Sequence, residues 1–364
     1  MERISYLFGT MQLSLFPTLR EEVGELTDKE RQLIFVLEVL DIEKHISRRH
    51  WFGRRPKGRN NIARAFVAKA FYNFPTTAAL IDRLRRDRVL RRLCGWEYRN
   101  QVPGEWAFSR AFAEFAESGF VDIVHETLVK ELVGNNVVFH ISRDATAINS
   151  REKSVKKEIA PTEEPKVKAK RGRPKKGEIR PIPEKTRLQK QRGWSLKECL
   201  DDLPTACDVG TKKNAKGYKS SWIGYKFHID VADNGIPISA ITTSASVHDS
   251  QAAIPLAMIS NDRVESFYDL MDSAYDAEEI RQTSIDMGHV PIIDPNARGG
   301  EKLPMEADRA RRYNGRSASE RFNSDLKDNH GGSMLRVKGH RKVHTHLMLG
   351  LLVIFAMNVI NFAT

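Results

Sequence analysis

Apolar residues recur at helical spacing through the first third of the chain. Asn61–Phe74 is one such segment, and Thr77–Leu93 is a second, with Thr76 or the first residue of the segment placed to cap its first turn. Pro103 opens a third segment that continues to Phe120. These patterns predict an all-helical domain over residues 1–135.

Beyond residue 192 the pattern changes. Ile223–Val231 and Ile236–Thr243 are typical of strands, and Asp233-Asn234-Gly235 between them is a hairpin signal. Shorter segments then alternate between the apolar spacing of strands and that of helices. We expect strands at Val137–Ser142, Phe267–Met271 and His289–Ile293, and helices at Ser250–Ile259, Ala277–Met287 and most of the last sixty residues. The sequence therefore predicts a mixed α/β domain over residues 136–364.

Charge is concentrated in residues 151–192, which carry 16 Lys or Arg against 6 Asp or Glu. The segment also has five prolines and no Phe, Trp or Tyr, so it cannot bury enough apolar surface to offset its ordering entropy. We predict a disordered basic linker that interrupts the α/β domain. The whole chain has a formal net charge of +12, which favours an anionic partner such as nucleic acid or a membrane surface.

The linker contains Arg171-Gly172-Arg173-Pro174, which is similar to the core of an AT-hook. An extended Arg-Gly-Arg can enter the narrow minor groove of A·T-rich DNA, where negative potential is strongest. Arg171 and Arg173 are therefore candidate DNA-binding residues. The alternative is a charged tether that attracts phosphates without entering the groove.

The remaining composition argues against a membrane or secreted protein. The apolar run Leu347–Ala363 has 17 residues and includes Asn358 and Asn361, so it is short and polar for a membrane span and predicts a buried helix. The start of the chain lacks the pattern of a signal peptide. Three cysteines exclude a disulfide scaffold and favour a reducing compartment, and Cys199 and Cys207 are too far apart for a zinc knuckle.

Two acidic residues stand at the ends of predicted strands. Asp144 comes after Val137–Ser142, and Asp272 comes after Phe267–Met271. Strand ends are where open α/β sheets place their chemistry, although an Asp there can also cap a turn. Asp276 is an alternative ligand to Asp272, but capping of the next helix suits it better. For His248-Asp249 we expect a supporting or capping role, because chain neighbours rarely face one another.

A third acidic residue belongs to a group that shares one face of a predicted helix. The offsets of its members are 0, 3, 7 and 14, and Phe322 and Leu326 form the buried stripe on the opposite side. The Asn314-Gly315 turn signal puts the first member near the helix start. The members are Tyr313, Arg316, Glu320 and Lys327.

Two aspartates and a glutamate brought together could hold two divalent cations about 4 Å apart. Hard oxygen ligands suit Mg²⁺ or Mn²⁺. One ion would lower the pKa of an attacking water or 3′-hydroxyl, and the other would stabilise the leaving oxygen of a phosphodiester. Arg316 and Lys327 would neutralise phosphates.

The string Tyr313-x2-Arg316-x3-Glu320-x6-Lys327 resembles the Y-(2)-R-(3)-E-(6)-K signature of DDE transposases from bacterial insertion sequences. The stretches around Asp144 and Asp272, together with those at 224–228 and 246–250, resemble the same family in the same order. The resemblance implies a ribonuclease H-like fold, with Asp144, Asp272 and Glu320 as catalytic metal ligands. By the same resemblance, Tyr313, Arg316 and Lys327 contact transposon-end DNA.

The expected activity is metal-dependent DNA cleavage and strand transfer of an insertion sequence. The partners would be the inverted-repeat ends and target DNA, bound by a homodimer in the cytoplasm at the bacterial nucleoid, with residues 1–135 binding DNA. Two alternatives stay open: a nuclease that hydrolyses DNA without joining it, and a non-catalytic DNA-binding protein derived from a transposase.

Overall fold

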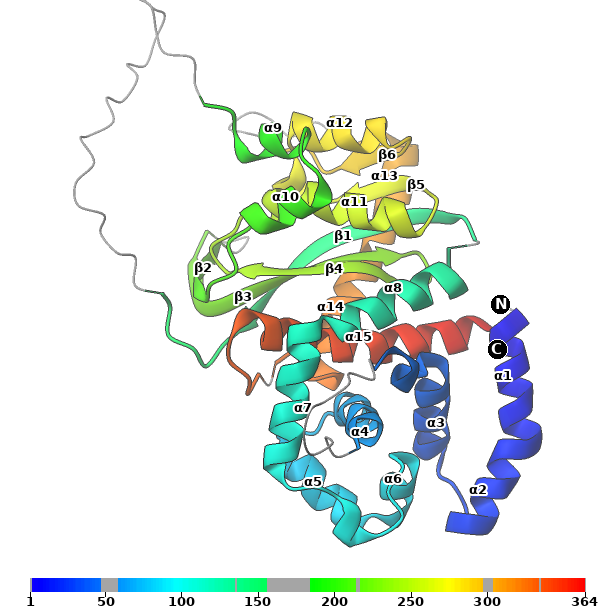
Figure 1. Ribbon diagram of the computed structural model, residues 1–364. Helices are drawn as coiled ribbons and strands as arrows, with labels where there is room; N and C mark the ends of the chain where they lie inside the picture. The colour runs from blue at the N-terminus through cyan, green and yellow to red at the C-terminus, as the bar shows by residue number, and fades with distance from the viewer. Residues whose placement is uncertain are drawn as a thin grey trace, which may run out of the picture.

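The computed structural model describes residues 2–46, 58–134, 136–155, 184–213, 217–296, 304–333 and 335–363. Helices form the lower part of the molecule in Figure 1, and a sheet with helices on both faces forms the upper part. The predicted AT-hook residues Arg171 and Arg173, and most of the predicted linker, lie outside the described residues.

The first part of the chain is helical throughout its described residues. The capping box of Thr27 and Glu30 starts α3, and Thr76 caps α5 through its hydroxyl. The elements are α1 (Glu2–Thr10), a π-helical turn η1 (Met11–Leu15), α2 (Phe16–Val23), α3 (Asp28–Leu40), η2 (Ile42–His45), α4 (Arg59–Phe71), α5 (Thr77–Arg86), α6 (Arg88–Leu93), η3 (Arg99–Gln101), α7 (Glu105–Ser118) and α8 (Phe120–Leu132).

The predicted helix Thr77–Leu93 is in fact two helices. Asp87 adopts extended backbone angles between α5 and α6. Its carboxylate accepts a hydrogen bond from the backbone N–H of Leu90 at 3.0 Å and so caps the second helix. A capping side chain inside a periodic apolar pattern therefore breaks a helix that periodicity alone predicts as continuous.

The second part contains one mixed sheet with the strand order β2-β3-β1-β5-β6, and β4 also pairs with β3. β1 runs antiparallel to β3 and parallel to β5, and β5 runs parallel to β6. The predicted hairpin is present as β3 and β4. The strands are β1 (Val138–Asn149), β2 (Asp208–Lys213), β3 (Lys219–Ala232), β4 (Pro237–Ser244), β5 (Ser266–Met271) and β6 (Val290–Ile293).

Helices cover both faces of this sheet. On one face, Ser260 of α11 (Ala253–Arg263) donates a hydrogen bond to Asp230 of β3. On the other, Ser319 of α14 (Ser317–Asn329) bonds to Ser142 of β1. The remaining elements are α9 (Arg187–Gln191), α10 (Leu196–Asp202), η4 (Asp249–Ala252), η5 (Ser273–Tyr275), α12 (Glu278–Asp286), α13 (Ala307–Tyr313), η6 (Asn314–Arg316) and α15 (His340–Ala363).

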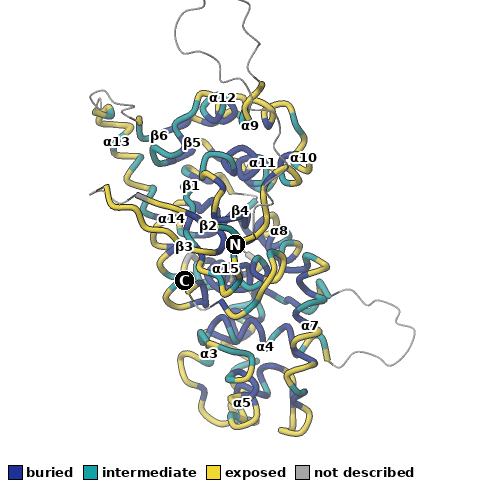
Figure 2. The backbone as a smooth tube through the Cα atoms, turned by 90° about the vertical axis from the view of Figure 1, so that its left-hand side faces the viewer, coloured by how far each residue is buried: buried dark blue, intermediate teal, exposed yellow. Residues whose placement is uncertain are grey.

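The C-terminal apolar run lies in the core, as predicted. It forms the greater part of α15, a helix long and apolar enough to cross a membrane, yet 72% of its most apolar stretch, within His340–Asn361, is buried. α15 packs against α3, α4 and α7 as well as β4, and Figure 2 shows buried residues continuing from it into the lower helices. One apolar core therefore joins the helical part to the sheet.

The end of the predicted disordered linker is ordered. Residues 184–192 include the short helix α9, which begins with a capping box formed by Thr186 and Gln189. Gln191 is buried and donates to the backbone carbonyl of Gln251 at 2.9 Å, and Leu188 packs against an apolar cluster. Proline content and charge did not reveal these local contacts.

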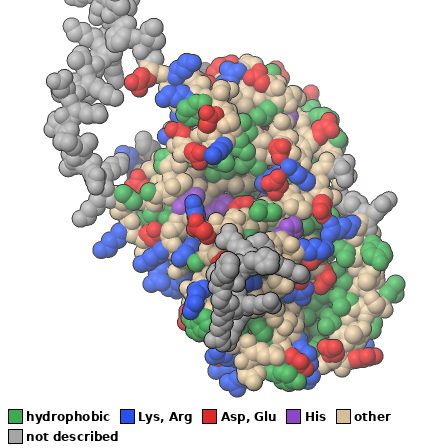
Figure 3. Space-filling model, viewed as in Figure 1, with side chains coloured by type: hydrophobic (Ala, Val, Ile, Leu, Met, Phe, Trp, Pro, Cys, Tyr) green, Lys and Arg blue, Asp and Glu red, His purple; other side chains and the backbone are tan. Residues whose placement is uncertain are grey.

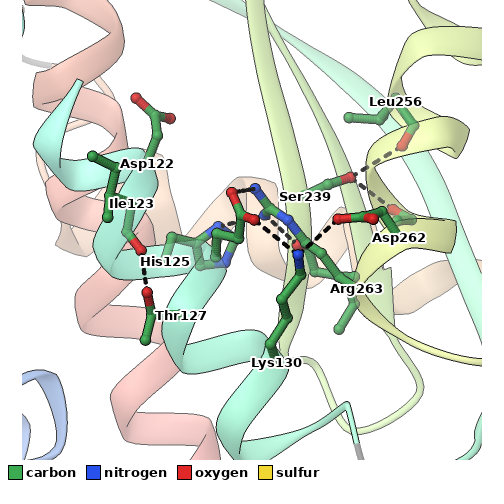
Figure 4. Close-up of polar contacts among 12 residues, drawn as sticks. Asp122, Ile123, His125, Thr127, Lys130, Ser239, Leu256, Asp262 and Arg263 are labelled. Carbon is green, nitrogen blue, oxygen red and sulfur yellow. Dashed lines mark hydrogen bonds and ion pairs between the residues drawn. The ribbon is translucent and has the colours of Figure 1, made fainter. Parts of the chain in front are cut away.

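A polar network joins α8 to the sheet and to α11 (Figure 4). Arg263 donates to His125 Nδ1 at 3.1 Å, so His125 Nε2 carries the proton that it donates to the carbonyl of Pro237 at 2.9 Å. Lys130 bridges Glu126 on its own helix and Asp262 on α11. Burial and the neighbouring guanidinium lower the pKa of His125 to about 3, so the imidazole is neutral.

We expect the protein to lose stability as the pH falls below about 6.5. Burial lowers the pKa of His125 to about 3 and those of His228 and His346 to about 4, so only the unfolded chain takes up these protons between pH 6.5 and 4. Each histidine then removes about 1.4 kcal/mol per pH unit from the free energy of unfolding. Urea unfolding at a series of pH values measures this slope. A His125→Gln variant should show a slope smaller by about one proton, and an unchanged slope would contradict the assignment.

Candidate active site

Asp144 of β1 and Asp272, the residue directly after β5, are neighbours at two adjacent parallel strands. Arg143 of β1 pairs with Met271 of β5, so the residue that follows each of them is an aspartate on the same face of the sheet. β5 ends at Met271, whereas β1 continues to Asn149, because its far half pairs with β3. Asp144 therefore lies inside β1, opposite Ile229, and not after the strand as predicted. The edge created by the end of β5 nevertheless brings the two carboxylates together.

Helix α14 lies along the same face and carries the third carboxylate. Ser142 Oγ bonds to Ser319 Oγ at 2.7 Å and donates to the backbone carbonyl of Arg316 at 2.9 Å. One turn further along, Asn323 Nδ2 donates to Asp144 Oδ2 at 3.0 Å. These contacts fix the register of α14 on β1, and they leave Glu320, between Ser319 and Asn323, exposed at the edge of the contact.

Arg316 is the positive group among these carboxylates. Its guanidinium forms an ion pair with Glu320, four residues along the helix. Burial acts to lower its pKa, but Tyr313 and the carboxylates Glu320, Asp144 and Asp272 outweigh burial and raise the pKa. All three predicted metal ligands therefore act electrostatically on one cationic side chain.

Burial raises the pKa of Asp144 to about 6. The hydrogen bond from the Ala145 backbone and the charge of Arg316 oppose this change, whereas the negative charges of Asp272 and Asp249 add to it. The negative charge of a half-buried carboxylate beside other carboxylates is only partly compensated by neighbouring cations. Such a group gains from binding a cation.

Asp272 and Asp276, the two alternative metal ligands, differ in their hydrogen-bond and ion-pair partners. Asp272 Oδ1 accepts from the backbone N–H of Ala274 at 2.9 Å, so it also caps a turn. Asp276 does not cap α12; both its oxygens are engaged, one by Arg281 and the other by the backbone N–H of Asn296. His248 has the predicted capping role in η4, and Asp249 pairs with Lys226.

Tyr313 and Lys327 flank the carboxylates. Tyr313 ends α13, and backbone angles remain helical through η6 into α14, so the predicted shared face is preserved across the Asn314-Gly315 signal. The guanidinium of Arg316 lies 5.7 Å from the centroid of the Tyr313 ring. Burial and the neighbouring Lys212 lower the pKa of Lys327. Phe322 and Leu326 are buried on the opposite side, as predicted.

Within the part of the chain that the structure describes, no three His, Cys, Asp or Glu side chains are already gathered into a metal site. Glu320 is instead paired with Arg316. The donor set itself is all carboxylate oxygen, which is what Mg²⁺ and Mn²⁺ prefer.

Sequence patterns missed the residues that support the site. Asn323 could have been found from its offset of three from Glu320, which places both on one side of α14. Arg143 was seen only as a neighbour of Asp144, yet it makes a buried bidentate ion pair with Asp230, at 2.8 and 2.7 Å. No local pattern connects two residues 87 positions apart.

Two families match the chain. One, described as "Transposase DDE domain", matches residues 167–356, more than half of the chain. The chain belongs to the transposase DDE domain family. A second family, "Transposase domain (DUF772)", matches residues 21–114, within the helical part. No curated protein and no solved structure matches the chain.

The transposase matches extend over most of the predicted site. Asp272 and the group of Tyr313, Arg316, Glu320 and Lys327 fall inside residues 167–356, whereas Asp144 precedes them. The place of Asp144 therefore rests on the strand register with β5. The matches support a DNA-transposing enzyme, and the mixed sheet flanked by helices agrees with that family.

In this transposase, most arginines of the second predicted helix serve the fold. Arg83 pairs with Asp87, Arg86 with Asp82 and Arg92 with Glu97. Arg91 is buried and donates to the backbone carbonyls of Leu84 and Arg85 in the last turn of α5. Arg88 donates to the carbonyl of Glu22. The arginine-rich appearance of residues 83–92 therefore overstates the charge available to DNA.

Proposed function

We propose that this transposase cuts DNA at the ends of its insertion sequence and joins them to target DNA in a reaction that needs Mg²⁺ or Mn²⁺. The observation that carries the proposal is the convergence of Asp144, Asp272 and Glu320 on the single cation Arg316. Three carboxylates around one positive group, from β1, from the residue after β5 and from α14, are suited to metal-dependent phosphoryl transfer. A ribonuclease H-like fold, inferred from the family and the mixed sheet, would place them so.

Asp144, Asp272 and Glu320 would hold two Mg²⁺ or Mn²⁺ ions. Their oxygens match the hard-ligand chemistry of these ions, and Arg316 now supplies the positive charge that Glu320 needs. Bound ions would activate the attacking oxygen and stabilise the leaving oxygen of the phosphodiester.

The protein's own basic and polar groups would position the DNA. Arg316 and Lys327 border the carboxylates, so in our proposal they neutralise phosphates next to the cleaved bond, and the phenol of Tyr313 is a further contact. Asn323 holds the Asp144 carboxylate in place through its amide. We assign end binding to residues 1–135 and chemistry to residues 136–364. Arg171 and Arg173 remain proposed minor-groove contacts, and a homodimer would hold the two ends.

The test uses labelled duplexes that carry the element's own terminal repeats, together with a target plasmid. We expect nicked ends and end–target joined products with Mg²⁺ or Mn²⁺ and none with EDTA. Cleavage without joined products would instead identify a nuclease, since the same ligands serve hydrolysis. Binding without any metal-dependent cleavage would identify a non-catalytic DNA-binding protein.

A further inference from the structure

A pocket of about 450 Å³ lies between the helical part and the segment that follows α14. One side is formed by α4, α7 and the turn that leads into α5. The other side is formed by His330 and Gly331 after α14, residues 336–338, and the first turns of α15. Arg151, which follows β1, completes the rim. The pocket is therefore built from both family-matched regions and lies apart from the carboxylates.

The pocket is strongly basic. Five Lys or Arg side chains and one acidic residue, Glu105, line it. Its histidines add no charge, because burial lowers the pKa of His346 to about 4 and also lowers that of His330. His346 instead donates to the backbone carbonyl of Gly331 at 3.0 Å. The five basic residues are Lys69, Arg151, Arg336, Lys338 and Lys342.

None of these five cations has an ion pair or side-chain hydrogen bond to another described residue. Nearby arginines on the same helix behave differently, since Arg59 pairs with Glu114 and Arg64 with Glu43. Lys69 is the least exposed of the five, and burial lowers its pKa to about 8. A partly buried ammonium without a counter-charge is costly unless an anion binds it.

The pocket also has an apolar lining, which determines the kind of ligand that would fit. Phe66, Phe74, Phe108, Phe112 and Leu349 line the pocket behind its basic rim. Lys and Arg side chains also gather on the left side of the molecule in Figure 3, between the sheet and the lower helices. An apolar floor beneath unpaired cations suits a ligand with a phosphate and an apolar body, as a nucleotide unit has.

We propose that this pocket binds a backbone phosphate of the DNA, with Lys69 and Lys342 as its principal contacts, at a distance from the bond that is cut. The proposal rests on the proposed function for its choice of DNA. The helix α14 connects the two sites, because it carries Glu320 and ends directly before His330. Ten residues of helix span about 15 Å, or four to five base pairs along a duplex. The bound phosphate should therefore lie roughly that far from the cleaved bond.

The test compares Lys69→Gln and Lys342→Gln in the full-length protein with Lys130→Gln, which removes a lysine that is already paired with Glu126 and Asp262. Affinity for the element-end duplex is measured across a salt series. We expect each pocket variant to bind about 5- to 10-fold more weakly at low salt and to reduce the slope of log affinity against log salt by about 0.9. The control should bind as the wild type does.

Thermal unfolding of the DNA-free proteins separates a binding role from a structural one. Lys69→Gln removes an uncompensated charge, so it should unfold at the wild-type temperature or higher. A neutral methylphosphonate is then placed at successive positions of the duplex. One position, about four to five nucleotides from the cut, should weaken binding to wild type more than it weakens binding to Lys69→Gln, because that variant has already lost one of the two contacts.

Wild-type affinity and salt slope for both pocket variants would overturn the proposal, as would additive losses at every methylphosphonate position. Cleavage is scored on the same samples. Loss of affinity in the pocket variants, in a protein that shows no metal-dependent cleavage, would support the pocket while refuting the proposed function. Normal metal-dependent cleavage together with unchanged DNA affinity in the pocket variants would support the proposed function and refute the pocket.

Discussion

Asp144→Asn, Asp272→Asn and Glu320→Gln should each reduce DNA cleavage and joining by roughly 10³-fold or more, because loss of a metal ligand removes several kcal/mol of transition-state stabilisation. The amides keep the shape of the side chains, and Asn can still cap the turn at 272 and accept from Asn323. DNA affinity should stay within a few-fold of wild type, since phosphate contacts come from basic side chains. Single-turnover cleavage of an end duplex, with binding measured separately, gives both numbers.

Asp276→Asn is the matched control for this series. Its carboxylate is already engaged by Arg281 and the backbone of Asn296, so the variant should cleave near the wild-type rate. Wild-type cleavage by Asp272→Asn together with loss in Asp276→Asn would move the ligand to position 276. Cleavage at the wild-type rate by all four variants would refute a carboxylate site.

The second large effect concerns the buried ion pair beneath the site. Arg143 and Asp230 are 1% and 0% exposed, and their bidentate contact joins β1 to β3 one residue before Asp144. Arg143→Met leaves the Asp230 carboxylate buried with only Ser260 as a donor among the contacts described. The free energy of unfolding should fall by about 3–5 kcal/mol, as measured by urea denaturation.

The double variant Arg143→Met/Asp230→Asn tests the cause of that loss. It removes the stranded charge while an amide oxygen can still accept from Ser260. We expect it to be more stable than Arg143→Met alone and to regain over half of the lost free energy. A double variant that is less stable than either single one would show that packing volume, rather than an unpaired charge, is responsible.

Sequence patterns predicted the elements that have strong local signals. The β3–β4 hairpin, the strand ending at Met271 and the buried C-terminal helix follow from periodicity and turn residues, which depend on neighbours in the chain. The patterns failed where a distant partner decides the outcome. β1 runs to Asn149 because β3 pairs with it, and α9 is ordered because Gln191 reaches Gln251.

In the candidate site, too, local spacing predicted some features, and distant partners in the chain decided the others. The spacing from Tyr313 to Lys327 places their side chains on one helical surface, next to the buried side of α14 through which Ser319 contacts β1. Parallel pairing of β1 with β5 brings Asp144 to Asp272, and it cannot be read from either strand alone. The paired state of Arg83, Arg86 and Arg92 was likewise hidden, because composition counts charges without their partners.

The claim that position 272 ligates a catalytic metal is tested most directly by a change of metal specificity. Asp272→Cys replaces a hard oxygen ligand by a softer sulfur, which Mn²⁺ accepts more readily than Mg²⁺. Cleavage of the end duplex by Asp272→Cys and Asp272→Ala is measured with each metal. We predict that both variants are inactive with Mg²⁺ and that only Asp272→Cys recovers cleavage with Mn²⁺. Identical behaviour of the two variants with both metals would contradict a metal ligand at this position.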